Sequence, residues 1–276
     1  MERIVSIPDE LRQNPLLFQR NFDGFGYVPG AEFKSLETQA NEFSAMMPEL
    51  VYDPLALAPY KKPAFVMPGA EAFCLMAKVS ALGKRYGIQD PYTAGYPHIT
   101  AHYIHEFRES ISLQIGGNKN PTYEETFQQL CAGENGPRQV YPHLVPLIER
   151  LEEEALGDYL AMPVNLGVLF QSWNSRAVAT VAPQLGMLPL CAAHFFSLML
   201  THSHFVAPIP PDSPYIETLR LGCPGDFWAG EHPKGIDGEQ HMSIRFRRGS
   251  RTNLSTHVDT ERCYGYESWA VGFLPL

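Results

Sequence analysis

The sequence predicts an α+β protein in which a mainly helical body precedes a C-terminal section of loops and short β-hairpin strands, within a single large domain. Apolar residues recur at close to helical spacing over residues 31–48. The segment 188–202 is apolar nearly all round, which is typical of a helix buried on most sides. After Pro208, prolines and glycines become frequent and short β-prone pieces replace the helical periodicity.

Apolar spacing and turn residues place the expected elements along the chain. Helices are expected over residues 8–20, 31–48, 69–86, 122–132 and 143–160, the last with Glu152, Glu153 and Glu154 on its exposed side. Residues 98–113 fit a helix or a strand, and helix is favoured because Pro97 suits a first helical position and apolar residues follow every four. Residues 164–182 stay open between helix and strand.

The change in composition divides the chain into two sections. Residues 1–205 form the helical body that carries the histidine clusters. Residues 206–276 form the Pro/Gly-rich section, with short strands at 241–247, 254–258 and 268–273. This second section has few apolar runs, so we expect it to pack on the body rather than fold independently.

Composition excludes several classes of protein. The 276 residues carry a formal net charge of −9, which disfavours nucleic acid as a partner. The longest apolar stretch is interrupted by His194 and Ser197 and is too short to cross a bilayer, so no membrane association is expected. The five cysteines form no C-x-x-C pair, which favours a reduced, cytoplasmic compartment over a disulfide framework.

Nucleotide and hydrolase motifs are absent from the sequence. It has no P-loop, no G-x-G-x-x-G that opens a helix, no G-x-S-x-G and no H-E-x-x-H. Phosphate-binding loops, dinucleotide-binding units, α/β-hydrolase serines and zincin sites therefore have no support.

A row of three histidines and a carboxylate is the first candidate site. His98, His102, His105 and Glu109 follow one another at helical spacing and would share a face of a helix. Neutral imidazole binds iron, zinc or copper, and a carboxylate completes a mixed nitrogen and oxygen site. The alternative interpretation is a solvated helix face opposite an apolar stripe.

His194 is the second candidate because it lies inside the most apolar segment of the chain. Burial of an imidazole is costly unless its nitrogens find partners. It is therefore either a core histidine that is hydrogen-bonded to protein groups or a ligand to a metal or haem iron.

Two short patterns suggest a different chemistry. His98-Ile99-Thr100 and His241-Met242-Ser243 each read histidine, apolar residue, hydroxyl residue. The pair resembles phosphoesterases that have two such motifs, and the resemblance covers six residues. It implies a metal-independent hydrolase in which both histidines and both hydroxyls surround a phosphate.

The basic cluster near the C-terminus is a candidate for anion binding. Arg245, Arg247 and Arg248 are expected to hold a substrate carboxylate or the propionates of a haem, because arginine binds such groups bidentately. The alternative is an exposed strand with ion pairs to the many acidic residues.

The leading functional hypothesis is an oxygenase-like oxidoreductase that uses histidine-ligated iron, as haem or as a non-haem centre. Its substrate would be a small organic molecule, carboxylate-bearing or aromatic. His98 and His102 would be catalytic, and His194, His98, His102, His105 and Glu109 are the candidate metal ligands. The rival hypotheses are the metal-independent hydrolase and a non-catalytic ligand-binding or assembly protein.

Overall fold

The computed structural model describes most of the chain between residues 34 and 274. The described residues are 34–55, 72–111, 114–115, 118–132, 137–166, 170, 173–202, 219–228, 240–246, 253–258 and 267–274. The helix expected over residues 8–20 and the residues Arg247 and Arg248 lie outside these ranges. Within them, no helix is long and apolar enough to cross a membrane.

A mixed eight-stranded sheet organises the described part of the chain. Its strand order is β1-β4-β10-β6-β8-β9-β2, and β5 also pairs with β10. The strands are β1 (Ala72–Ala77), β2 (Gln114–Ile115), β4 (Tyr159–Leu166), β5 (Met187–Pro189), β6 (Leu219–Gly222), β8 (Gln240–Phe246), β9 (Asn253–Val258) and β10 (Glu267–Phe273). A separate antiparallel pair joins β3 (Arg138–Val140) to β7 (Asp226–Trp228).

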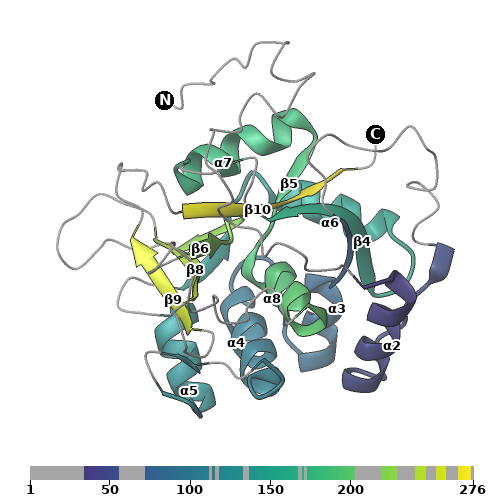
Figure 1. Ribbon diagram of the computed structural model, residues 1–276, viewed down its shortest axis with the longest axis horizontal. Helices are drawn as coiled ribbons and strands as arrows, with labels where there is room; N and C mark the ends of the chain where they lie inside the picture. Colours follow the sequence, from purple (N-terminus) through teal and green to yellow (C-terminus); the bar gives the residue numbers. More distant parts are fainter. Residues whose placement is uncertain are drawn as a thin grey trace, which may run out of the picture.

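Strand β10 lies between two apolar cores, as its alternating side chains require. Trp269, Val271 and Phe273 contribute to the smaller core, which includes residues of α7 (Ser175–Val181) and the 3-10 turn η5 (Ala182–Leu185). Ala270 belongs to the larger core on the opposite face. Figure 1 shows α7 on one side of β10 and most other helices on the other side.

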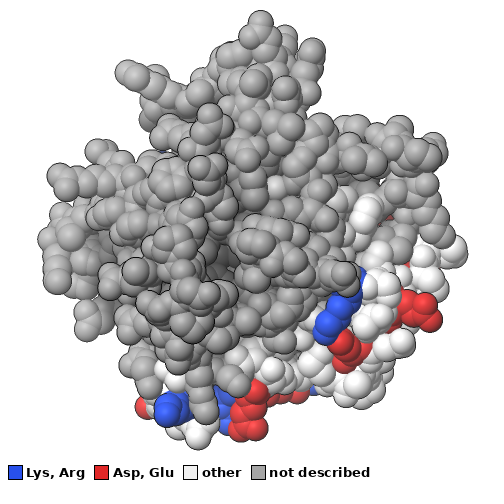
Figure 2. Space-filling model, in the orientation of Figure 1, with Lys and Arg blue, Asp and Glu red and all other residues white. Residues whose placement is uncertain are grey.

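The helices of the larger core are amphipathic, except for α8. They are α2 (Leu36–Met46), α3 (Val79–Tyr86), α4 (Tyr96–Phe107), α5 (Tyr123–Thr126), the π-helical turn η4 (Phe127–Ala132), α6 (Val145–Glu154) and α8 (Ala192–Thr201). All ten residues of α8 are buried. On the face in Figure 2, the described basic and acidic side chains lie close to one another, not in large areas of one sign.

Several predictions from the sequence are confirmed. The α+β class, the helix within 31–48, the helical choice for 98–113 and the all-round burial of the helix within 188–202 agree with α2, α4 and α8. Pro97 lies in the first turn of α4. The short strands expected near the C-terminus correspond to β8, β9 and β10, and β8 and β9 form an antiparallel hairpin.

Two predicted helices were wrong in part, and the body is less helical than expected. Residues 72–77 form β1, and only 79–86 are helical. The helix expected over 143–160 ends at Glu154, and the chain enters β4 at Tyr159. Both strands are apolar at most positions, as buried strands are, and such runs lack a period that would separate them from buried helices.

Candidate functional site

The candidate site begins where β5 leads into α8. Cys191 is the residue before the helix, and His194 lies in its first turn. Side chains of a helix lean toward its N-terminus, so the His194 ring returns toward Cys191. The Cys191 Sγ atom lies 3.1 Å from His194 Nδ1, and both side chains are fully buried.

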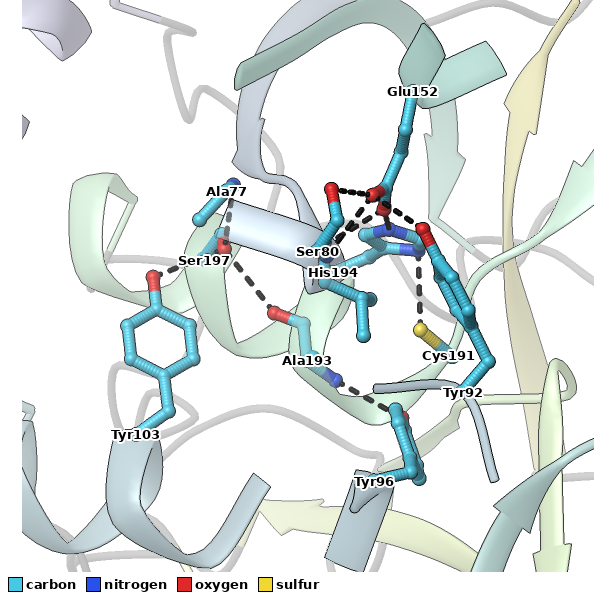
Figure 3. A network of polar contacts seen from close by, with 11 residues as sticks. Ala77, Ser80, Tyr92, Tyr96, Tyr103, Glu152, Cys191, Ala193, His194 and Ser197 are labelled. Carbon is cyan, nitrogen blue, oxygen red and sulfur yellow. Dashed lines mark hydrogen bonds and ion pairs between the residues drawn. The ribbon is translucent and has the colours of Figure 1, made fainter. Parts of the chain in front are cut away.

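The other nitrogen of His194 faces a buried carboxylate on α6. His194 Nε2 lies 3.8 Å from Glu152 Oε1, which is an ion-pair distance without a hydrogen bond. Figure 3 shows the thiol, the imidazole and the carboxylate in sequence, with Ser80 and Tyr92 around the carboxylate. The sequence prediction that Glu152 lies on an exposed side was wrong, since its exposure is 5%.

Glu152 is held by groups from α3 and from the turn that follows it. The backbone N–H groups of Val79 and Ser80 donate to its two oxygens at 2.7 and 3.0 Å. The Ser80 hydroxyl also donates to Oε2, and the Tyr92 hydroxyl donates to the same oxygen at 2.7 Å. The carboxylate therefore caps the N-terminus of α3, where helix amides lack partners and negative charge is favoured.

The surroundings of this pair favour its ionised form. Burial alone lowers the pKa of His194, but the adjacent Cys191 sulfur and the Glu152 carboxylate outweigh burial and raise it to about 10. For Glu152, burial raises the pKa, yet His194, Ser80 and Tyr92 lower it on balance. Near neutral pH the geometry therefore holds an imidazolium between a sulfur atom and a carboxylate.

A second buried carboxylate, that of Asp226, lies at the start of α8. Asp226 Oδ2 accepts from the Ala192 backbone N–H at 2.7 Å and from the Tyr96 hydroxyl at 2.5 Å. Asp226 Oδ1 lies 2.5 Å from Arg138 Nη1. Asp226 therefore caps the start of α8 and fixes the loop that follows Cys223 against the site.

A third set of polar contacts anchors the middle of α8. Ser197 Oγ accepts from the Ala77 backbone N–H at 3.1 Å and donates to the Ala193 carbonyl at 3.1 Å. The Tyr103 hydroxyl lies 3.0 Å from the same oxygen, as Figure 3 shows. These contacts join β1, α4 and α8, so the site residues of α8 are held on a fixed element.

The predicted histidine row lies on α4, away from this site. His98 is exposed, His102 and His105 are half-buried, and Glu109 lies beyond the end of the helix with a side chain that is 79% exposed. Across the described residues, no three His, Cys, Asp or Glu side chains come together as a metal site. The three histidines therefore share α4 without forming a common ligand set, and Glu109 lies outside the helix.

The residues of the two H-x-hydroxyl patterns lie on a helix, α4, and on a strand, β8. His98 is exposed whereas Thr100 is buried, so the two side chains lie on different faces of α4. His241 and Ser243 lie on β8, where His241 is in register with His257 of β9. Arg245 also lies on β8, opposite Arg220 of β6 and Asn253 of β9.

Sequence reasoning identified His194 but missed its partners. The signal that could have identified Cys191 is its C-x-x-H spacing to His194 at the start of the apolar segment. Glu152, Tyr92, Asp226 and Arg138 had no local signal, because each reaches the site through contacts distant in the chain.

Comparisons with known proteins give no further assignment. No protein-family model matches this chain, and neither the curated proteins nor the solved structures contain a match.

Proposed function

We propose that this chain is a thiol-dependent enzyme that transfers or hydrolyses an acyl group, with Cys191 as the nucleophile. The observation that carries the proposal is the placement of His194, with one ring nitrogen 3.1 Å from the Cys191 sulfur and the other 3.8 Å from a Glu152 oxygen. A nucleophile, a proton carrier and a group that orients the carrier are the three parts of such a site.

The roles follow from the charges. The Cys191 sulfur lies 3.1 Å from His194 Nδ1, and a thiolate is the reactive form of cysteine. The N-terminus of α8 favours negative charge at this position. Glu152 does not react, and its part is to orient the imidazole and stabilise its charge.

The proposed reaction has two steps. The Cys191 sulfur bonds to the carbonyl carbon of an amide or ester, the bond to the leaving nitrogen or oxygen breaks, and His194 gives its proton to the leaving group. Water then attacks the thioester, the carboxylic acid leaves, and the imidazole takes the proton of the water.

Burial restricts the substrate. Cys191 has no exposed surface, so we propose a small, uncharged acyl substrate rather than a protein. The Tyr96 hydroxyl lies at the start of α8, where it donates to Asp226 and accepts from the Ala193 amide at 3.4 Å. Burial raises the pKa of Tyr96 well above its usual range, which keeps the phenol protonated as a donor.

The earlier hypotheses remain predictions. Both His194 nitrogens face protein groups, which favours proton transfer over iron ligation at this residue. The described residues give no contact in favour of the two-histidine hydrolase or of a non-catalytic assembly protein.

Alkylation of the buried cysteines tests the proposal. Cys74, Cys131, Cys191 and Cys223 are all buried, so exposure through global unfolding would affect all four alike. We expect iodoacetamide at pH 6 to modify Cys191 at least about tenfold faster than Cys74, as measured by peptide mass spectrometry, because the His194 imidazole lies beside the Cys191 sulfur. His194→Gln should remove this difference and leave the Cys74 rate unchanged.

Activity provides the second measurement. Cys191→Ser should abolish hydrolysis of small acyl esters such as p-nitrophenyl acetate, while the folded far-UV spectrum is kept. Equal alkylation rates at the four thiols, or ester hydrolysis that survives Cys191→Ser, would overturn the proposal.

A further inference from the structure

We propose that His98 and His102 form a two-histidine chelate for a divalent transition-metal ion such as Zn²⁺ or Ni²⁺ on the outer face of α4. The two residues are one helical turn apart, so their side chains are neighbours on the helix surface. His98 is exposed and His102 is half-buried, so an ion can reach the pair from solvent. This site is separate from the Cys191 site and does not depend on the function proposed for it.

Aromatic rings fix both imidazoles. His102 stacks on Tyr86 of α3 and makes a tilted contact with Tyr123 of α5, with ring centroids 5.2 and 4.3 Å away. His98 stacks on Phe127 of η4 at 4.5 Å. Rings held in this way lose little further freedom when they bind an ion, which favours chelation.

A hydrogen bond leaves one His98 nitrogen available. His98 Nδ1 lies 3.2 Å from the Tyr123 hydroxyl. A histidine that binds metal usually donates its other ring N–H to a partner of this kind, which fixes the tautomer. The tautomer with Nδ1–H toward Tyr123 places the lone pair on Nε2, the nitrogen that would bind the ion.

The neighbouring carboxylates explain why the site has two protein ligands rather than four. Glu106 is already bound to Arg85 and to the Tyr86 hydroxyl. Glu109 lies 3.8 Å from Arg108 and beyond the helix end. Water would therefore fill the remaining coordination positions, and the affinity should be moderate.

Titration of the full chain with NiCl₂ or ZnCl₂ alone tests this inference. We expect one site by calorimetry, with a change in tyrosine fluorescence from Tyr86 and Tyr123. His98→Ala and His102→Ala should each weaken binding at least about tenfold, which corresponds to ~1.4 kcal/mol. The matched control His143→Ala, whose Nε2 contacts the Ala179 carbonyl elsewhere, should leave binding unchanged.

Further variants distinguish metal binding by the Cys191 thiol from metal binding by His98 and His102. Cys191→Ser should retain the site, and the double variant of His98 and His102 should lose it while the far-UV spectrum is unchanged. Absence of binding at millimolar metal, or equal binding by the wild type and the double variant, would overturn the inference.

Discussion

Arg138 and Asp226 form a fully buried ion pair, with Nη1 2.5 Å from Oδ1. In the β3–β7 ladder, Asp226 lies opposite Val140 and Arg138 opposite Trp228, so the two charges meet diagonally. Arg138 Nε also donates to the Leu130 carbonyl at 3.0 Å. The pair thereby ties the small β3–β7 ladder to η4 and to the start of α8.

Removal of one charge from this pair should destabilise the protein strongly. Asp226→Asn leaves a buried guanidinium without its counter-charge, and we expect the free energy of unfolding in urea to fall by about 3–5 kcal/mol. The control is Glu42→Gln in the half-exposed Lys34–Glu42 pair, where the loss should stay below about 1 kcal/mol. Similar losses for both variants would contradict the importance of burial.

Stability should depend on pH through His194 and Glu152. Because the folded pKa of His194 is about 10, its contribution is fully present below the unfolded value near 6.5 and is lost as pH rises toward 10. The free energy of unfolding should therefore fall by up to about 1.4 kcal/mol for each pH unit in that window. The folded pKa of Glu152 is lowered, so its contribution is present above about 4.5 and is lost as pH falls through the folded pKa.

Urea unfolding at pH 6, 7, 8 and 9 measures this dependence. His194→Gln should flatten the profile, since the group that titrates is gone. Glu152→Gln should shift the loss to lower pH, because the imidazolium then lacks its carboxylate. A wild-type profile as flat as that of His194→Gln would show that His194 does not hold a proton in this window.

Ser197→Ala should lower the free energy of unfolding by more than the removal of one small hydroxyl group suggests. The hydroxyl accepts from the Ala77 amide, and its removal leaves that buried donor without this partner. We expect a loss of about 1–3 kcal/mol in the free energy of unfolding. Thr180→Ala on α7 is the matched control, since the exposed Thr180 hydroxyl bonds only to the preceding turn. The control should stay within about 0.5 kcal/mol, as surface substitutions usually do.

Two glycines should respond to substitution for different reasons. At Gly95 a Cβ atom would lie 2.0 Å from the Gln89 carbonyl oxygen, so Gly95→Ala should cost about 1–3 kcal/mol through overpacking. Gly87 has a φ of +66° and open space around it, so Gly87→Ala should cost about 1–2 kcal/mol through backbone strain. Asparagine tolerates that conformation and should recover part of the loss at Gly87, but at Gly95 it should be no better than alanine. Recovery at both positions would contradict this difference.

Helices with a clear apolar period or an all-round apolar composition could be predicted from the sequence. Short, continuously buried strands could not. The helix within 188–202 could be predicted because all-round apolarity implies burial. The run Ala72–Ala77 was misjudged because a short apolar segment has no period that distinguishes strand from helix. Helix α4 could be assigned because Pro97 and the four-residue apolar spacing agree.

For a related reason, His194 of the candidate site could be predicted from the sequence but Glu152 could not. His194 stood out because an imidazole in an apolar run needs a partner. Glu152 did not stand out, because three consecutive glutamates suggest a solvated face, and its true partners are amides at the start of α3. Capping of one helix by a side chain of another is a tertiary contact, which no local pattern encodes.

The origin of the Glu152 contacts has a consequence for the order in which the protein folds. Ser80 and Tyr92 reach Glu152 across 72 and 60 residues of chain, whereas Cys191 and His194 are three residues apart. Closing such long loops costs entropy, and this cost arises before the contacts that compensate for it have formed. During folding the sulfur and the imidazole can therefore meet within a nascent helix well before the carboxylate arrives. The arrangement of Cys191, His194 and Glu152 would then be complete only after the last long-range contacts have formed. A partly folded chain would hold the sulfur and the imidazole without the carboxylate.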